Sequence, residues 1–248
     1  MTRAPLALAA LLAIAIGGCG GDDPDEVLSK TAENLGKVRS GDLTMRMSVG
    51  AGRGGAVGFA LSGPFALPPS GGMPRARIAY TQIAGPRRAT VTLTSTGRRA
   101  FATVNGRTRE LPAAQARRLR VGAGSAGRQL KIGSWVRDPK LAEGPTLDGA
   151  QTERVTAKLD VRAAARDLLR VAGALGPGTG ALGQSQDDLE RAVKGSSFDL
   201  LTGKDDHLLR RLRIGIELRV PGGRQALVRF ALGVRKPNQP VRIPAPKG

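Results

Sequence analysis

Two short segments of the sequence carry residue types that could do chemistry. Asp205 and Asp206 stand beside His207, the only histidine of the chain, and carboxylate–imidazole pairs belong to hydrolase triads. A triad also needs a nucleophile on a defined turn, and the sequence contains no G-x-S-x-G motif. We therefore interpret residues 205–207 as a polar turn that enters a strand, and we predict no catalytic residue and no enzyme.

Residues 122–127 have the glycine spacing of a dinucleotide-binding loop. That motif works when a strand precedes it and a helix follows, because the helix N-terminus then holds the pyrophosphate. Here arginines precede the glycines and a predicted strand follows them, so we expect a glycine-rich loop and no cofactor. Asp199, Asp205 and Asp206 are a conceivable set of metal ligands, but one Cys and one His exclude the common metal sites, and we predict no metal.

The single cysteine, Cys19, follows a start typical of a secretory signal peptide. Arg3 makes the first residues positive, and residues 6–16 form an apolar run that is too short for a bilayer core, which takes about 20 helical residues. The sequence Ile-Gly-Gly then precedes Cys19, which resembles a bacterial lipobox. The resemblance implies cleavage before Cys19, acyl chains (palmitate, for example) on that residue, and anchoring on the extracytoplasmic side of the cell membrane. An ordinary cleaved signal with an incidental cysteine is the alternative.

The chain therefore divides into three parts. We expect a signal peptide over residues 1–18, a lipidated tether over residues 19–23 and a single lipoprotein domain over residues 24–248. A length of 248 residues suits one domain, and one cysteine excludes an internal disulfide framework.

The charge is strongly basic, with 39 Lys and Arg against 20 Asp and Glu. The excess gathers in residues 87–137, where Glu110 is the only acid. Export and the scarcity of aromatic side chains for base stacking argue against nucleic acid. An anionic envelope surface or wall polymer is the partner that the charge then favours, with a compositional bias toward arginine as the alternative.

Helical signals occur in four segments. Asp23 is a favourable N-cap, Pro24 suits the first helical position, and Glu26 lies three residues after the cap. Helices are predicted over residues 24–39, 112–119, 162–175 and 186–194.

Alternation of apolar and polar residues predicts the strands. They are expected over residues 45–49, 57–62, 76–83, 89–95, 99–104, 130–136, 154–161, 208–220 and 226–234. Asn105 and Gly106 predict a tight hairpin turn, residues 144–151 a loop, and residues 221–223 a turn between the last two strands. The resulting order of elements predicts an α+β fold, an antiparallel sheet with helices on one face.

Several segments in this order resemble LprG/LppX-type lipoproteins, a family of lipid-binding lipoproteins with a LolA-like half-barrel fold. The similar segments are residues 27–35, 43–47, 100–106, 148–155, 205–212 and 240–246. The resemblance implies a curved antiparallel sheet, a half-barrel, with helices on its concave face that enclose a hydrophobic cavity for acyl chains.

The function that this implies is a non-catalytic lipoprotein that binds and carries a lipid or glycolipid, acting as a monomer. The residues expected to line the cavity are apolar positions of the predicted strands: Val91, Leu93, Ile214, Ile216, Leu218, Val228, Phe230 and Leu232. The alternative is a surface-anchored interaction protein with a solid core that binds an anionic wall polymer or a protein partner.

Overall fold

The computed structural model describes residues 23–51, 55–69, 72–116, 132–164, 167, 191–219 and 225–246. The predicted signal peptide with Cys19, the glycine-rich residues 122–127 and the turn at 221–223 lie outside these residues. So do most of the helices predicted over residues 162–175 and 186–194.

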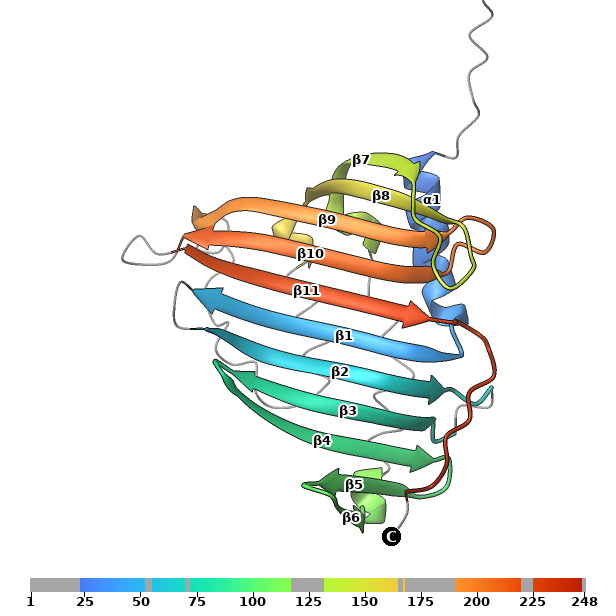
Figure 1. Cartoon of the computed structure of the whole chain (residues 1–248). Helices are drawn as coiled ribbons and strands as arrows, with labels where there is room; N and C mark the ends of the chain where they lie inside the picture. The colour runs from blue at the N-terminus through green and yellow to red at the C-terminus, as the bar shows by residue number, and fades with distance from the viewer. Residues whose placement is uncertain are drawn as a thin grey trace, which may run out of the picture.

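Eleven antiparallel strands form one open, curved sheet (Figure 1). Their order is β6-β5-β4-β3-β2-β1-β11-β10-β9-β8-β7. The strands are β1 (Ser40–Ala51), β2 (Ala56–Ala66), β3 (Arg75–Ala84), β4 (Arg87–Thr96), β5 (Ala100–Val104), β6 (Arg107–Glu110), β7 (Val136–Glu143), β8 (Thr152–Leu159), β9 (Val193–Gly203), β10 (Leu209–Arg219) and β11 (Gln225–Arg235).

The sheet consists of two meanders that meet at its centre. Strands β1 to β6 follow one another toward one edge, and strands β11 back to β7 follow one another toward the other. The first and last strands join the two halves, with Met45 opposite Leu232 and Met47 opposite Phe230. After β11 the chain runs along the ends of β1 to β4 (Figure 1).

Helix α1 (Pro24–Asn34) lies on the concave side of the sheet, at the end formed by β7 to β10 (Figure 1). It begins as predicted, because the side chain of Asp23 accepts a hydrogen bond from the Asp25 N–H at 3.0 Å. It ends earlier than predicted, and a 3₁₀ turn, η1 (Leu35–Lys37), follows it. Val27 and Leu28 of α1 are fully buried against the sheet.

The predicted α+β class and curved antiparallel sheet are confirmed, as is the last hairpin, in which β10 pairs with β11. The turn at Asn105 and Gly106 is also confirmed. Both residues have positive φ, 48° and 77°, and they join the paired strands β5 and β6.

Several other predictions about the elements were wrong. The strand expected over residues 130–136 is instead a 3₁₀ turn, η4 (Ile132–Trp135), and the strand β7 begins only at Val136. Ile132 and Trp135 are three residues apart and both fully buried, and one tight turn places two such residues on the same side.

The strand expected over residues 154–161 ends at Leu159, because Asp160 caps a helical segment that starts at Val161. Strand β9 was not predicted at all, and its first two residues, Val193 and Lys194, were expected to belong to a helix. Its residues Gly195 to Ser197 have little strand propensity, and Leu200 and Leu201 are both buried, so the alternation is lost.

Candidate functional site

The concave face of the sheet is an apolar surface that crosses all of its central strands. Directly paired residues of antiparallel strands point to the same face, so the register identifies the members of this surface. One row runs through Ile214, Phe230 and Met47 to Phe59. Toward the other edge, Leu61 lies opposite Tyr80, Tyr80 opposite Val91, and Val91 opposite Val104, all on the same face.

One half of this surface is closed by packing. Ile214, Ile216, Phe230 and Leu232 are buried and belong to one cluster with residues of α1. Trp135 fills the same cluster, and its indole N–H donates to Asp167 Oδ2 at 2.9 Å. We name the concave surface of β7 to β11, with its cover, the closed half.

The other half, on β2 to β5, is only partly covered. Its apolar side chains include three that remain well exposed: Val57 at 57%, Tyr80 at 38% and Val104 at 42% of their full accessible area. The rings of Phe59 and Tyr80 stack with their centroids 6.2 Å apart. We name the concave surface of these four strands the open half.

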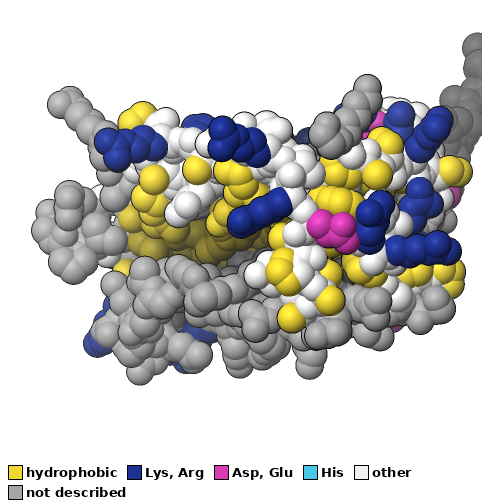
Figure 2. Space-filling view, turned by 90° about the horizontal axis from the view of Figure 1, so that it is seen from below, with side chains coloured by type: hydrophobic (Ala, Val, Ile, Leu, Met, Phe, Trp, Pro, Cys, Tyr) yellow, Lys and Arg dark blue, Asp and Glu magenta, His cyan; other side chains and the backbone are white. Residues whose placement is uncertain are grey.

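Figure 2 shows a hollow when the molecule is seen from below, from the edge that carries β5 and β6. Hydrophobic side chains form its floor, and Lys and Arg side chains stand along its border. Arg107 and Arg109 of β6 are exposed, and they share the concave face because they lie opposite Val104 and Ala102. The open half is thus an apolar wall with positive charge at its edge.

The eight residues predicted to line a cavity fall into both halves. The six on β10 and β11 lie together in the closed half, where Leu218 and Val228 are partly buried and the other four are buried. Val91 and Leu93 lie in the open half on β4, four strands from β11 and five from β10, and are partly buried. The two groups therefore face the same side of the sheet without forming one cluster.

Sequence analysis did not single out several members of the open half. They are Val57, Phe59, Leu61, Ile78, Tyr80 and Val104. The alternation of side chains along each predicted strand was the available signal, because every second residue points to the same face of the sheet. The strands were predicted but their pairing was not, so the sequence did not show which of the two alternating sets of residues in each strand faces inward.

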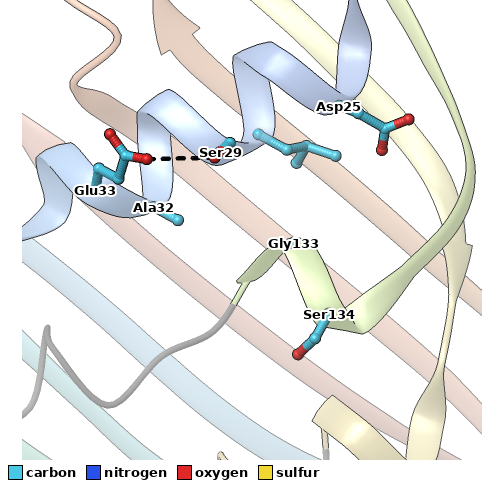
Figure 3. Close-up of a pocket in the computed structure, with 7 residues that line it drawn as sticks. Asp25, Ser29, Ala32, Glu33, Gly133 and Ser134 are labelled. Atoms are coloured by element: carbon cyan, nitrogen blue, oxygen red, sulfur yellow. Dashed lines mark hydrogen bonds between the residues drawn. The ribbon is translucent and has the colours of Figure 1, made fainter.

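A groove of about 500 Å³ lies between α1 and η4 (Figure 3). Leu28, Ala32 and Gly133 line its apolar part, and the carboxylates of Asp25 and Glu33 stand at its sides. The hydroxyl of Ser29 donates to Glu33 Oε1 at 3.4 Å, one helical turn away. This groove is a shallow surface feature beside the closed half.

The segment around His207 forms the connection between β9 and β10. A turn was predicted over residues 205–207 and is found one residue earlier, over 204–206; the His207 N–H donates to the carbonyl of Gly203 at 2.9 Å. Asp206 accepts from the Leu208 N–H at 2.9 Å and from the Arg210 guanidinium at 2.7 Å. Asp206 therefore holds the turn and the start of β10 together.

Within the described ranges, no three His, Cys, Asp or Glu side chains gather as metal ligands. In the same part of the chain, no helix combines the length and the apolar character that crossing a membrane requires.

Neither a protein-family model nor a curated protein matches the sequence. Among solved structures, the fold is similar to that of LprF from Mycobacterium bovis, with 13% sequence identity and a TM-score of 0.50 over 91% of this chain and 97% of LprF. Lipoprotein LppX from Mycobacterium tuberculosis matches 89% of this chain and 98% of its own at 14% identity and a TM-score of 0.46. The similarity to LprF confirms the predicted resemblance at the level of the fold alone.

Proposed function

We propose that this chain is a lipid-anchored protein of the cell envelope that binds the acyl chains of a lipid or glycolipid on its concave face and carries them without catalysing a reaction. The observation that carries the proposal is the open half, an apolar wall that the described residues cover only in part. The similarity of the whole chain to LprF at the level of the fold supports the same proposal.

The open half supports a carrier over a protein with a solid core. In a solid core, the residues of a concave sheet face are buried by the helices that cover it, as they are in the closed half. Val57, Tyr80 and Val104 instead expose large apolar side chains on β2, β3 and β5. Contiguous apolar surface of this kind marks an interaction site.

Acyl chains suit such a wall because they are flexible and need no hydrogen-bond partners. Burial of an acyl chain contributes about 0.8 kcal/mol for each CH₂ group, and the ordering of chain and protein offsets part of this gain. The polar headgroup would remain at the border of the hollow, where Arg107 and Arg109 could meet phosphate or hydroxyl groups.

The anchor proposed at Cys19 would hold this wall near the membrane. Only four residues separate Cys19 from Pro24, the first residue of α1. At about 3.5 Å for each extended residue, the start of α1 would stay within roughly 20 Å of the acylated cysteine. A lipid could then pass between the bilayer and the wall over a short distance.

Both edges of the sheet support action as a monomer. The edge strand β6 is short and carries Arg107, Arg109 and Glu110, and the other edge strand, β7, contains Pro139 with Asp138 at a positive φ of 52°. Charge, proline and irregular backbone at an edge oppose pairing with a second chain.

Native mass spectrometry of the full chain, purified from membranes in mild detergent, tests the function. We expect bound lipid in addition to the covalent acyl chains on Cys19. Val91→Asp should abolish the bound mass, because a carboxylate on the wall has no partner for its charge. Arg229→Gln, an exposed change on the convex face, is the matched control. A parent chain that holds no lipid, and takes none from vesicles after delipidation, would favour the solid-core alternative.

A further inference from the structure

The convex face of the sheet carries a trough between β10 and β1 whose floor is β11. Arg213 lies opposite Ala231, and Ala231 lies opposite Arg46. In the next row on the same face, Gly233 lies between Arg211 and Thr44. Because alanine and glycine have almost no side chain, the floor of the trough lies low between longer neighbours, and a pocket of about 320 Å³ results.

Four arginines surround this trough: Arg210, Arg211, Arg213 and Arg235. A register shift between Leu209 and Arg211 accommodates Arg210 as an additional residue of β10. Arg210 is only 8% exposed, and its Nη1 atom is buried without a hydrogen-bond partner. The Nε atom of Arg211 is buried and unpartnered as well.

The carboxylates near the trough are already paired. Asp206 binds Arg210 at 2.7 Å, and Asp148 binds Arg235 at 3.3 Å. Asp199 lies opposite Arg213 and accepts two hydrogen bonds from Arg154 at Oδ2, while its Oδ1 atom is buried without a hydrogen-bond partner. Among the described residues, neither Arg211 nor Arg213 forms an ion pair with a carboxylate, and the nearby Asp199 is bound by Arg154.

The positive charge at this place is costly without a counterion. Burial lowers the pKa of the Arg211 guanidinium, and repulsion from Arg213 lowers it further, while the nearby Asp199 acts in the opposite direction. Buried charges in proteins are normally paired, since an uncompensated buried charge destabilises the fold. An external anion would supply the missing partner.

We propose that this trough is a binding site for a phosphate group. Guanidinium groups match the oxygens of phosphate in pairs, which favours phosphate over a single halide ion. The volume is at the small end of ligand sites, so the trough suits a phosphate or a phosphorylated headgroup and not the acyl part of a lipid. The site is on the face opposite the apolar wall and does not depend on it.

Thermal unfolding of the full chain in detergent, in sodium phosphate and in sodium chloride at equal ionic strength, tests the site. A ligand that binds only the folded state raises the melting temperature. We expect phosphate to raise it by several degrees more than chloride. Phosphate also stabilises proteins in general by exclusion from their surface, and the variants separate this effect from binding.

Arg211→Gln and Arg213→Gln should each lose the phosphate-specific rise, and calorimetric titration with inorganic phosphate should give at least tenfold weaker binding. In chloride, Arg211→Gln should melt no lower than the parent, because it removes an uncompensated charge. Arg229→Gln, an exposed arginine on the same face, should keep the full rise. An equal rise in all variants, or none in the parent, would overturn the proposal, as would binding of an acidic peptide without binding of phosphate.

The source of the phosphate is tested with mixed micelles. If phosphatidylglycerol removes the effect of added inorganic phosphate and phosphatidylcholine does not, the ligand is an anionic lipid headgroup. If neither lipid competes, the site serves a soluble phosphorylated compound.

Discussion

At the scale of single residues, apolar side chains on the concave face have two roles that depend on what covers them. Ile214 is buried among Phe198, Phe230 and neighbouring side chains. Val91 has the same chemistry and the same face, yet it remains partly exposed between Tyr80 and Val104. The two positions should therefore respond differently to the same substitution.

Val91→Trp should leave the melting temperature of the lipid-free protein nearly unchanged, because the indole enters uncovered space. Lipid content after extraction should fall severalfold, since the ring occupies the wall. Ile214→Trp is the comparison in the closed half, where overpacking costs about 1–3 kcal/mol. Calorimetry and lipid mass spectrometry measure both effects. Equal losses of stability in the two variants would contradict an open half.

Asp160 is a residue whose charge stabilises a local structure. Its carboxylate accepts from the Ala163 N–H at 3.1 Å and from Arg137 at 2.6 Å. The hydrogen bond from Ala163, and then the bond from Arg137, lower the pKa of Asp160. This stabilisation is complete above the unfolded-state pKa of about 3.9, and it is lost as the pH falls through the lower folded-state value.

Asp160→Ala should therefore cost about 1 kcal/mol at pH 7, and the difference from the parent should become smaller at acid pH, where only the neutral capping oxygen remains. Urea unfolding at a series of pH values from 7 down to 2.5 measures the difference. Asp160→Asn, which keeps a capping oxygen without the charge, should lie between the two. A difference that is constant over the whole range would refute the role of the charge.

At the scale of elements, α1 is the piece that closes one end of the concave face. Its buried residues Val27 and Leu28 pack in the same cluster as Trp135 and the inner residues of β8 to β11. The Thr31 hydroxyl donates to Thr202 Oγ1 on β9 at 3.0 Å. The helix thus packs on the closed half and stabilises it. The segment that leads back to Cys19 precedes the first turn of the helix.

Leu28→Ala should destabilise the fold by about 2–5 kcal/mol, because Leu28 is fully buried and its truncation removes packing from the core. Chemical denaturation gives the free energy of unfolding. Ser29→Ala on the exposed side of α1 should change it by no more than about 0.5 kcal/mol. A small effect of Leu28→Ala would show that α1 is only loosely docked.

At the scale of the whole molecule, the proposed anchor and the surface charge would together determine where the protein acts. The chain carries a formal charge of +19, and exposed arginines stand on both faces of the sheet, among them Arg107 on the concave side and Arg229 on the convex side. If a short tether holds the protein at an anionic membrane, these arginines would lie close enough to the surface to be attracted by its negative charge.

Cys19→Ala should move the protein from the membrane fraction to the aqueous phase, because it removes the residue proposed to carry the acyl chains. Detergent phase separation and the intact mass of the product measure the change. Gly20→Ala should leave membrane retention unaltered. Unchanged retention of Cys19→Ala, with no loss of acyl mass, would refute the anchor.

The unanchored Cys19→Ala protein should bind anionic vesicles at low salt and leave them near 0.5 M salt. Surface attraction is already screened over about 10 Å at 0.1 M. Cosedimentation with phosphatidylglycerol vesicles measures the binding, and phosphatidylcholine vesicles are the comparison. Equal binding to both would mean that the basic charge is compositional.

The sequence by itself determined the features that depend on neighbours along the chain. Asp23 and Pro24 predicted where α1 begins, Asn105 and Gly106 predicted their turn, and alternation predicted most strands, including the final hairpin. These signals act over a few residues, because a cap, a turn and a side-chain period are all local.

The tertiary structure decided what depends on distant partners. The pairing of Met45 with Leu232 joins residues at opposite ends of the chain, and β9 exists because β8 and β10 flank it on both sides. The elements that pack on the concave face decided which of its residues are buried. Helix α1 and η4 bury the closed half, whereas Val57 and Tyr80 of the open half stay exposed. Periodicity shows that a strand has an apolar side, but only packing determines whether that side becomes a core or a binding wall.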